Sequence, residues 1–426
     1  MIYKLILILY NVIFSISLPF IVIKKLIRSR NNIGYRKRLL ERFGISPFKL
    51  DSSIIIHSVS VGESIAVAPL VKNLAAQYPD EKFIVTTMTP TGSEQVLKIY
   101  EKVNNVYHCY LPYDISIFLR IFFALNKPKL FIAMETELWP NLLSCCSSKN
   151  VPFILTNARL SNKSYLGYAK VKFVINRMLK DITHISAQSS DDAENFISLG
   201  YDKHKISITG NLKYDFVLPE KLDELAKQIT RNVRNTPIWI AASTHQGEEE
   251  LILEAHRLVH KKHNNSILII VPRHPERFNQ VHKLILDKGF TCTRRSNDKL
   301  ITNDDVYLAD SMGELMVLYN TCDIAFVGGS FSKTGGHNML EPAALSKAIL
   351  SGLSTFNFTQ IVQQMLGNNA IVITKTHIEL AENVIRLIDD QDLRNTMGSN
   401  ALQCFNSNQG SLNKQLNNIK KYIDEY

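Results

Sequence analysis

The segment Gly328–Pro342 reads GGSFSKTGGHNMLEP and follows a short apolar run, residues 324–327, that is typical of a buried strand. A helical pattern rich in alanine begins where the segment ends. A strand, a glycine-rich loop and a helix start in this order present backbone N–H groups and the positive end of a helix dipole to a ligand, which favours an anion such as phosphate. Because glycine loops also occur for geometric reasons alone, the other loops of the chain must support this interpretation.

The composition predicts an ordinary globular protein. The chain has 426 residues, of which 45% are hydrophobic and 21% charged, and this suits two or three globular domains, with two preferred. The six cysteines show no C-x-x-C spacing, and the neighbours Cys145 and Cys146 are poorly placed to bridge each other. They indicate free thiols in a reducing compartment.

The positive charge is concentrated near the beginning of the chain. The formal net charge is +10, but residues 24–43 hold eight Lys and Arg against Glu41 alone, and Lys4 adds one more cation. This leaves a charge of only +2 for the chain after Phe43. No basic face for a nucleic acid is indicated, and we expect no nucleic-acid partner.

An uncharged and mostly apolar run, residues 5–23, precedes the basic cluster and is long enough to cross a bilayer as a helix. A secretory signal would carry its charges before the apolar region, and a buried first helix of a soluble domain is the other alternative. We expect residues 1–23 to form a single membrane anchor and residues 24–50 a basic membrane-proximal segment. The positive-inside rule then places the rest of the chain on the cytoplasmic side of the membrane, near anionic lipids.

After the basic segment, β-rich runs alternate with helical stretches in two similar halves. Several runs are apolar throughout, as in parallel strands that are covered on both faces. The pattern predicts an α/β fold with two Rossmann-like domains, residues 51–220 and 221–426, facing across a ligand-binding cleft, with the last helix able to return to the first domain. The expected strands are residues 54–60, 83–89, 106–111, 130–134, 153–157 and 184–188, then 238–242, 267–271, 306–309, 324–327, 348–350 and 371–374.

Two loops of the first half carry carboxylates at strand ends. Glu63 follows a glycine at the start of a helical pattern, where it could deprotonate an acceptor hydroxyl or simply complement the helix dipole. Glu135 and Glu137 directly follow the apolar run 130–134 and lie beside Trp139, one of two tryptophans in the chain. Such a pair is hard to explain as solvated surface, although one of the two could hold the loop by accepting backbone hydrogen bonds. We expect Glu63 and Glu137 to be catalytic.

A third loop of the first half follows the run 153–157. Arg159 and Ser161 lie there, followed by basic and aromatic residues. This patch could hold anionic groups of an acceptor, together with Glu135, or it could be a solvated helix face.

In the second half, Arg273 and Arg277 follow the run 267–271. Arg273 is the better anion ligand because it lies nearer the strand end, and a guanidinium can clamp a phosphate with two bonds. Glu341, in the first turn after the glycine loop, is placed to accept hydrogen bonds from ribose hydroxyls. We expect the donor site to consist of Arg273, Ser330, Gly335, Gly336, Asn338 and Glu341.

No metal site or cofactor is predicted. The acidic pair Asp390 and Asp392 lies between helical stretches and indicates a turn and a helix cap. Four histidines on separate loops could converge but lack the pair spacing of metal ligands, so loop and cap roles are expected for them. They are His57, His245, His274 and His337.

Taken together, these motifs closely resemble the 3-deoxy-D-manno-octulosonic acid (Kdo) transferase family of lipopolysaccharide biosynthesis. The resemblance rests on seven ordered blocks, residues 57–64, 135–141, 157–161, 210–215, 271–278 and 328–342 and the membrane-proximal beginning. It implies a GT-B architecture, cytidine monophosphate-Kdo (CMP-Kdo) as the donor bound by the second half, and a lipid A precursor (lipid IVA) as the acceptor bound by the first half. It also implies that Glu63 is the general base of an inverting transfer.

Two other functions remain open from the sequence. One is a GT-B enzyme, either a glycosyltransferase or an epimerase, that uses another nucleotide sugar, since a fold does not fix the chemistry. The other is a membrane-tethered protein that binds a nucleotide or an anionic lipid without turnover. The three carboxylates speak against the second, because they would repel an anionic ligand unless one performs acid/base work.

Overall fold

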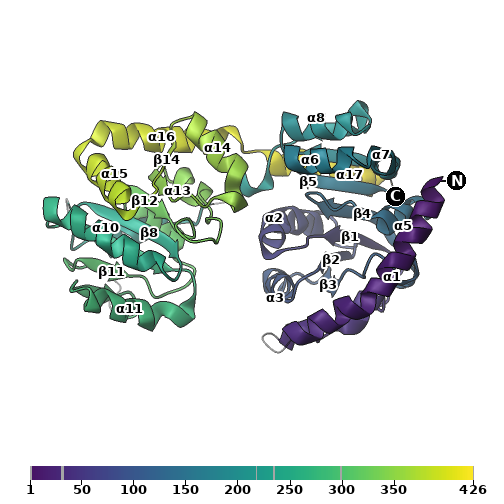
Figure 1. Ribbon diagram of the computed structural model, residues 1–426, viewed down its shortest axis with the longest axis horizontal. Coiled ribbons are helices and arrows are strands. Elements are labelled where there is room, and N and C mark those ends of the chain that lie inside the picture. The colour runs from purple at the N-terminus through teal and green to yellow at the C-terminus, as the bar shows by residue number, and fades with distance from the viewer. Residues whose placement is uncertain (1, 30–32, 217, 234–235, 298–299, 426) are drawn as a thin grey trace. The chain divides into compact units, whose positions relative to one another are not determined.

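The computed structural model describes the chain except residues 1, 30–32, 217, 234–235, 298–299 and 426. The chain divides into two compact units. Unit 1 comprises Met1–Asp215 and Gln409–Tyr426, and unit 2 comprises Phe216–Asn408, so the second unit is inserted into the first (Figure 1).

Unit 1 is built on a seven-stranded parallel sheet with the order β3-β2-β1-β4-β5-β6-β7. Every strand pair in it is parallel, and its central strands are buried on both faces, which explains their unbroken apolar runs. The strands are β1 (Ser53–His57), β2 (Phe83–Thr87), β3 (Val106–Tyr110), β4 (Pro128–Met134), β5 (Phe153–Ala158), β6 (His184–Ala187) and β7 (Ile206–Ile208).

Helices cover both faces of this sheet and enclose two hydrophobic clusters. On one face Phe131 lies between Phe123 and Phe153, with ring centroids 6.5 and 5.3 Å apart. On the other face Ile56 and Val67 pack with Leu416 from the last helix. The helices are α1 (Ile2–Arg28), α2 (Val61–Gln77), α3 (Pro90–Ile99), α4 (Ser116–Asn126), α5 (Pro140–Ser148), α6 (Asn162–Ala169), α7 (Lys172–Leu179), α8 (Ser190–Ser198) and α17 (Ser411–Asp424).

Unit 2 repeats the architecture with a second seven-stranded parallel sheet, in the order β10-β11-β9-β8-β12-β13-β14. Its core contains Trp239 and Phe326, both fully buried. The strands are β8 (Ile238–Thr244), β9 (Ile267–Pro272), β10 (Cys292–Arg294), β11 (Val306–Leu308), β12 (Ile324–Val327), β13 (Ala348–Ser351) and β14 (Ile371–Ile373). The helices are α9 (Leu222–Ile229), α10 (Glu248–Lys262), α11 (Phe278–Asp287), α12 (Leu315–Asn320), α13 (Leu340–Ala344), α14 (Thr359–Gly367), α15 (His377–Asp389) and α16 (Gln391–Ser407).

The predicted α/β fold with two parallel sheets is confirmed, and all twelve expected strands are present. The sequence missed β7 and β10. Both are three residues long and lie at a sheet edge, where partial exposure removes the continuous apolar run.

The carboxylate of Asp215 ties the last helix to unit 1. It accepts the N–H groups of Gly410 (2.7 Å) and Leu412 (2.6 Å) at the start of α17. Farther along α17, the buried Gln415 side chain accepts the N–H of Asn157 at 3.0 Å. The chain therefore leaves unit 1 and re-enters it at neighbouring points.

The basic segment differs from the expectation that its charges face a membrane. Arg38 forms a salt bridge with Glu41 at 2.6 Å, and Arg42 is fully buried with its guanidinium 4.0 Å from the ring centre of Tyr110. Burial lowers the pKa of Arg42. These two cations help to build unit 1, whereas Arg36 and Lys37 remain exposed.

The tie at Asp215 can be tested. We expect Asp215→Ala to reduce the protection of α17 amides against hydrogen exchange by about 10-fold or more, since each bond to a charged acceptor contributes about 1.5–3 kcal/mol. Hydrogen-exchange mass spectrometry measures this. Asp80→Ala, at an exposed position, is the matched control and should leave α17 unchanged. Equal protection of α17 in both variants would contradict the tie.

Candidate active site

The start of α2 positions Glu63. Ser60 caps the helix by accepting the N–H of Glu63 at 3.3 Å, and the Glu63 carboxylate accepts the N–H of Val59 and the hydroxyl of Ser60, both at 2.8 Å. This is a capping-box arrangement, so Glu63 has a structural role at the helix start in addition to complementing the helix dipole. The side chain remains only half-buried, and its carboxylate lies at the carboxyl end of β1.

Glu135 and Glu137 follow β4, the neighbour of β1 in the sheet. Glu135 has a left-handed backbone (φ 55°), which turns the chain sharply at the strand end, and its carboxylate lies 3.9 Å from the Lys213 ammonium. Glu137 accepts the indole N–H of Trp139. Adjacent parallel strands thus bring the two predicted loops to one edge of the unit 1 sheet.

The three carboxylates influence one another electrostatically. Burial raises the pKa of Glu63, and the charge of Glu135 raises it further against the opposing Val59 N–H. Burial also raises the pKa of Glu137 to about 7; the Trp139 bond opposes this shift, and the charges of Glu63 and Glu135 add to it. A carboxylate with a raised pKa is a better proton acceptor near neutral pH. The cluster therefore has the electrostatics of a general-base site.

The loop after β5 adds Arg159 and Ser161 to the same edge. The hydroxyl of Thr136, between the two glutamates, donates to the Arg159 carbonyl, which joins this loop to the carboxylate loop. Among the described residues, Arg159 Nε is buried without a hydrogen-bond partner. Ser161 caps α6 by accepting the N–H of Ser164 at 3.2 Å, so its hydroxyl has a structural role there.

In unit 2, the buried carboxylate of Glu248 shapes the glycine loop. It accepts the N–H groups of Gly329 (2.7 Å), Phe331 (2.8 Å) and His245 (2.9 Å). The first part of the loop therefore folds around an internal anion and uses these N–H groups itself. The sequence did not reveal this role, because three consecutive glutamates at a helix start are also typical partners of the helix dipole.

The second part of the loop requires its glycines. Gly335 and Gly336 have φ angles of 96° and 76°, and a Cβ on Gly335 would lie 2.5 Å from the Phe356 ring. The Gly336 N–H donates to the Gly329 carbonyl at 2.8 Å. Close approach to the following loop, as well as backbone conformation, explains this pair.

The polar residues of the loop divide into two kinds. Ser330 is buried, and its hydroxyl donates to the Val327 carbonyl and accepts the N–H of Gly352. Asn338 instead bridges the loop to the helix by donating to the Glu341 carboxylate at 3.2 Å. Burial raises the pKa of Glu341, although the Asn338 bond and the nearby Arg273 charge oppose the shift.

The two arginines after β9 are distinguished by their partners. Arg277 holds the fully buried Glu249 with two bonds, of 2.5 and 3.2 Å, and is structural. Arg273 is exposed and, among the described residues, makes no ion pair. Its charge nevertheless acts on Glu341 and His337, which places the guanidinium near the second part of the glycine loop.

Three of the four singled-out histidines converge beside this loop. The Nε2 atoms of His245 and His337 are 2.7 Å apart, and the ring of His274 lies 5.2 Å from that of His245. Burial, together with the neighbouring cations, lowers the pKa of His337 to about 4. His57 lies in unit 1, bonded to Thr86. Within the described ranges, no group of His, Cys, Asp or Glu is arranged to hold a metal ion.

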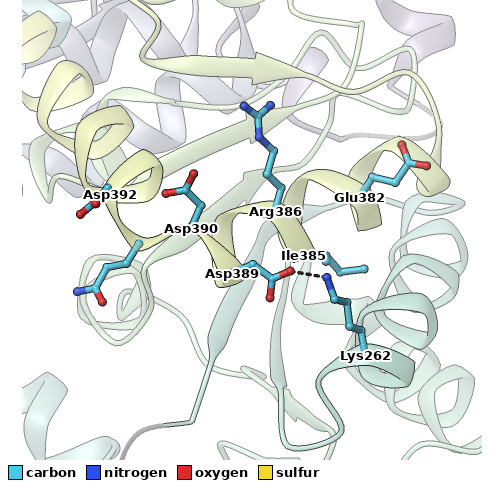
Figure 2. A pocket seen from close by; sticks show the side chains of 8 residues that line it. Lys262, Glu382, Ile385, Arg386, Asp389, Asp390 and Asp392 are labelled. Carbon is cyan, nitrogen blue, oxygen red and sulfur yellow. Dashed lines mark hydrogen bonds and ion pairs between the residues drawn. The ribbon is translucent and has the colours of Figure 1, made fainter.

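A large open cavity of about 850 Å³ lies elsewhere in unit 2, at the junction of α15 and α16 (Figure 2). Lys262 forms an ion pair with Asp389 across its wall. Asp390 accepts the N–H of Leu393 at 2.8 Å and caps α16, which confirms the predicted turn and cap at Asp390 and Asp392. None of the predicted donor residues lines this cavity.

Comparisons with known proteins agree with the motifs. Residues 37–216 match the family model for 3-deoxy-D-manno-octulosonic-acid transferase (kdotransferase), and residues 235–403 match that for glycosyl transferases group 1. A 3-deoxy-D-manno-octulosonic acid transferase of Haemophilus influenzae is 41% identical over 92% of each chain. Another, of Rickettsia bellii, is 32% identical over 91% of this chain and 92% of that protein.

Among solved structures, UDP-GlcNAc 2-epimerase from Neisseria meningitidis matches with a TM-score of 0.58 and 16% identity, over 88% of this chain and all of that one. A glycosyltransferase from Rickettsia africae has a TM-score of 0.53. At this identity the likeness shows the fold alone. Fold and family models together define a glycosyltransferase of the GT-B type. The chain belongs to the 3-deoxy-D-manno-octulosonic acid transferase family, and the predicted family and enzyme class are confirmed.

The raised pKa of Glu137 has a consequence for stability. Because its pKa is about 7 when folded and 4.5 when unfolded, its contribution to stability is lost as the pH rises between these values. Glu137→Gln removes the charge but keeps an acceptor for Trp139. We expect the unfolding free energy of the variant to rise relative to that of the parent by about 1–2 kcal/mol when the pH is raised from 5 to 8.

Urea unfolding at both pH values measures this difference. Glu94→Gln, an exposed carboxyl on α3, is the control and should behave like the parent at each pH. A pH-independent difference for Glu137→Gln would contradict the burial of its charge.

The role of Glu248 predicts a large and local effect. Glu248→Gln removes the anionic acceptor of three N–H groups and brings an amide donor toward them, so we expect unit 2 to lose about 2–4 kcal/mol of unfolding free energy. The exposed neighbour Glu250 provides the matched control, Glu250→Gln, with an expected change within about 0.5 kcal/mol. Thermal unfolding of both variants measures the difference, and equal transition temperatures would refute the role of Glu248.

Proposed function

We propose that the protein transfers Kdo with inversion from CMP-Kdo to a lipid A precursor, lipid IVA, in lipopolysaccharide biosynthesis. Membership of the family supports Kdo as the sugar that is transferred. The observation that carries the chemistry is the cluster of Glu63, Glu135 and Glu137 at one sheet edge of unit 1, with the raised pKa values of Glu63 and Glu137.

In the proposed reaction, an acceptor hydroxyl attacks the anomeric carbon of Kdo while the bond from that carbon to the CMP oxygen breaks. The hydroxyl proton passes to the Glu63 carboxylate, and CMP leaves as an anion. The capping box holds the Glu63 carboxylate in a fixed orientation, and the Glu135 charge strengthens it as a base. Glu137 keeps the carboxylate loop in place through its hydrogen bond to Trp139, and its charge contributes to the electrostatic environment of the cluster.

Acceptor binding is proposed for the edge that holds Glu135, Arg159 and Ser161. A lipid A precursor carries phosphates, and the half-buried Arg159, with an unpartnered Nε among the described residues, provides a cation for one of them. Ser161 contributes mainly by capping the start of α6 close to Arg159.

Donor binding is proposed for unit 2. Arg273 carries an exposed charge that is free to meet the CMP phosphate, and Glu341, held by Asn338, can accept hydrogen bonds from the ribose. Gly335 and Gly336 allow the backbone to approach the ligand. Ser330 contributes indirectly, because its buried hydroxyl braces the loop.

Attachment to the cytoplasmic face of the inner membrane is part of the proposal. Among the described residues, α1 is the one helix that is long and apolar enough to cross a membrane. Exposed Lys24 and Lys37 follow its apolar part and suit anionic lipid headgroups.

The base assignment predicts that Glu63→Gln lowers the rate of Kdo transfer by about 100-fold or more, because the variant retains size but not basicity. CMP binding, measured by calorimetry, should change little, since Glu63 belongs to unit 1. Glu94→Gln is the control: it removes an exposed carboxylate on α3, outside the cluster, so the parent transfer rate should remain. A Glu63→Gln rate within a few-fold of the parent would refute the assignment.

The reaction itself is tested by mass analysis of the product formed from lipid IVA and CMP-Kdo. We expect a mass increase of one or more Kdo units. Thermal stabilisation by cytidine rather than uridine nucleotides separates the proposal from a GT-B enzyme that uses another nucleotide sugar. An unmodified acceptor together with stabilisation by uridine nucleotides only would overturn it.

A further inference from the structure

Helix α1 has two different faces. The residues of one face are half-buried against unit 1, and most of them follow one another at intervals of three or four residues, as expected for one side of a helix. They include Tyr3, Leu7, Asn11, Phe14, Leu18 and Lys25. The opposite face is apolar and exposed, with Phe20 at 72% and Ile16 at 66% exposure. Figure 1 shows α1 running alongside unit 1 instead of projecting from it.

The inward face is fixed by polar contacts at its centre. The Asn11 amide donates to the Asn141 side chain at 2.8 Å and accepts the N–H of Ser116, at the start of α4, at 3.0 Å. The buried Asp114 carboxylate accepts the N–H of Asn141 and hydrogen-bonds to Tyr10. Unit 1 thus satisfies the polar side chains that would be costly in hydrocarbon.

Contacts also occur at both ends of the helix. The Arg177 guanidinium lies 5.4 Å from the Tyr3 ring centre, and the Lys25 ammonium lies 4.9 Å from that of Tyr113. Twenty-two helical residues separate Tyr3 from Lys25, or about 33 Å, which exceeds the roughly 30 Å of bilayer hydrocarbon. A spanning α1 with these contacts would carry Asp114, which lies beside the middle of the helix, into the hydrocarbon.

We propose that α1 lies in the plane of the membrane interface, its outer face inserted between the headgroups of an anionic bilayer, and does not cross. The inference rests on the proposed membrane attachment and specifies its mode. Exposed Lys4 and Lys24 flank the apolar face at its two ends. In an in-plane helix both lysines meet anionic headgroups of one leaflet, whereas a spanning helix separates them by the bilayer.

The in-plane helix places the carboxylate cluster close to the lipid surface. Phe14 on α1 lines a small apolar cavity of about 30 Å³ together with Tyr113 and Trp139. Trp139 in turn donates to Glu137. Phe14 and Trp139 therefore connect the membrane helix to the candidate base site. A lipid-linked acceptor would then reach Glu63 without leaving its leaflet.

Cysteine labelling in native membranes distinguishes the two modes. Lys4→Cys and Lys49→Cys each add an exposed thiol to the full chain, and the parent gives the background of its native cysteines. With a membrane-impermeant maleimide, we expect both variants to be labelled above background in inside-out vesicles and neither in intact spheroplasts. Labelling of Lys4→Cys only in spheroplasts, or in neither preparation, while Lys49→Cys is labelled in vesicles, would overturn the in-plane placement.

A second pair of variants separates docking from lipid insertion. Phe20→Glu should reduce flotation with phosphatidylglycerol-containing liposomes about ten-fold or more without shifting Tm, since Phe20 faces outward. Asn11→Leu should lower Tm by about 2–8 °C and leave flotation unchanged, because it removes bonds to unit 1. A raised or unchanged Tm for Asn11→Leu would contradict docking. Transfer to detergent-dispersed lipid IVA tests the proposed function independently of both outcomes.

Discussion

The buried carboxylate of Glu248 is the constraint on which the candidate donor site depends. It gathers three backbone N–H groups from two loops, and the later part of the glycine loop takes its position from them. Unit 1 has a counterpart, since Glu63 also starts a helix after a central strand. There the carboxylate binds only its own cap and stays half-exposed. A carboxylate at a helix start after a central strand thus braces two loops in unit 2 and stays partly accessible in unit 1.

Much of the fold follows from local pattern. Parallel strands that are covered on both faces are apolar throughout, so residues 130–134 and 324–327 identify their sheets without any tertiary information. The edge strand Ile206–Ile208 lacks such a run and was missed. Arg42 shows where local pattern fails. Its place in a cluster of cations predicts an exposed, membrane-facing side chain, yet tertiary packing buries it against Tyr110. Burial of a charge depends on distant partners and leaves no local signal.

The candidate site could be predicted in part. Glu63 and Glu135 come together because their loops end adjacent strands, a consequence of topology that the alternating pattern already contains. The inward turn of Ser330 depends on its contact with Gly352, 22 residues later, and the meeting of His245 with His337 joins loops 92 residues apart. No spacing rule encodes either contact. The docking of α1 through Asn11 is of the same kind, since hydropathy alone describes a helix without its neighbour.

The insertion of unit 2 into unit 1 sets the order in which the protein can be completed during synthesis. Leu416 and Ile419 on α17 close one face of the first sheet, but the ribosome makes them after all of residues 216–408. Until then Ile56 and Val67 have no cover from this helix. The nascent chain therefore carries an unfinished apolar surface while a second domain folds, and a product that terminates before residue 411 is a substrate for chaperones and proteases.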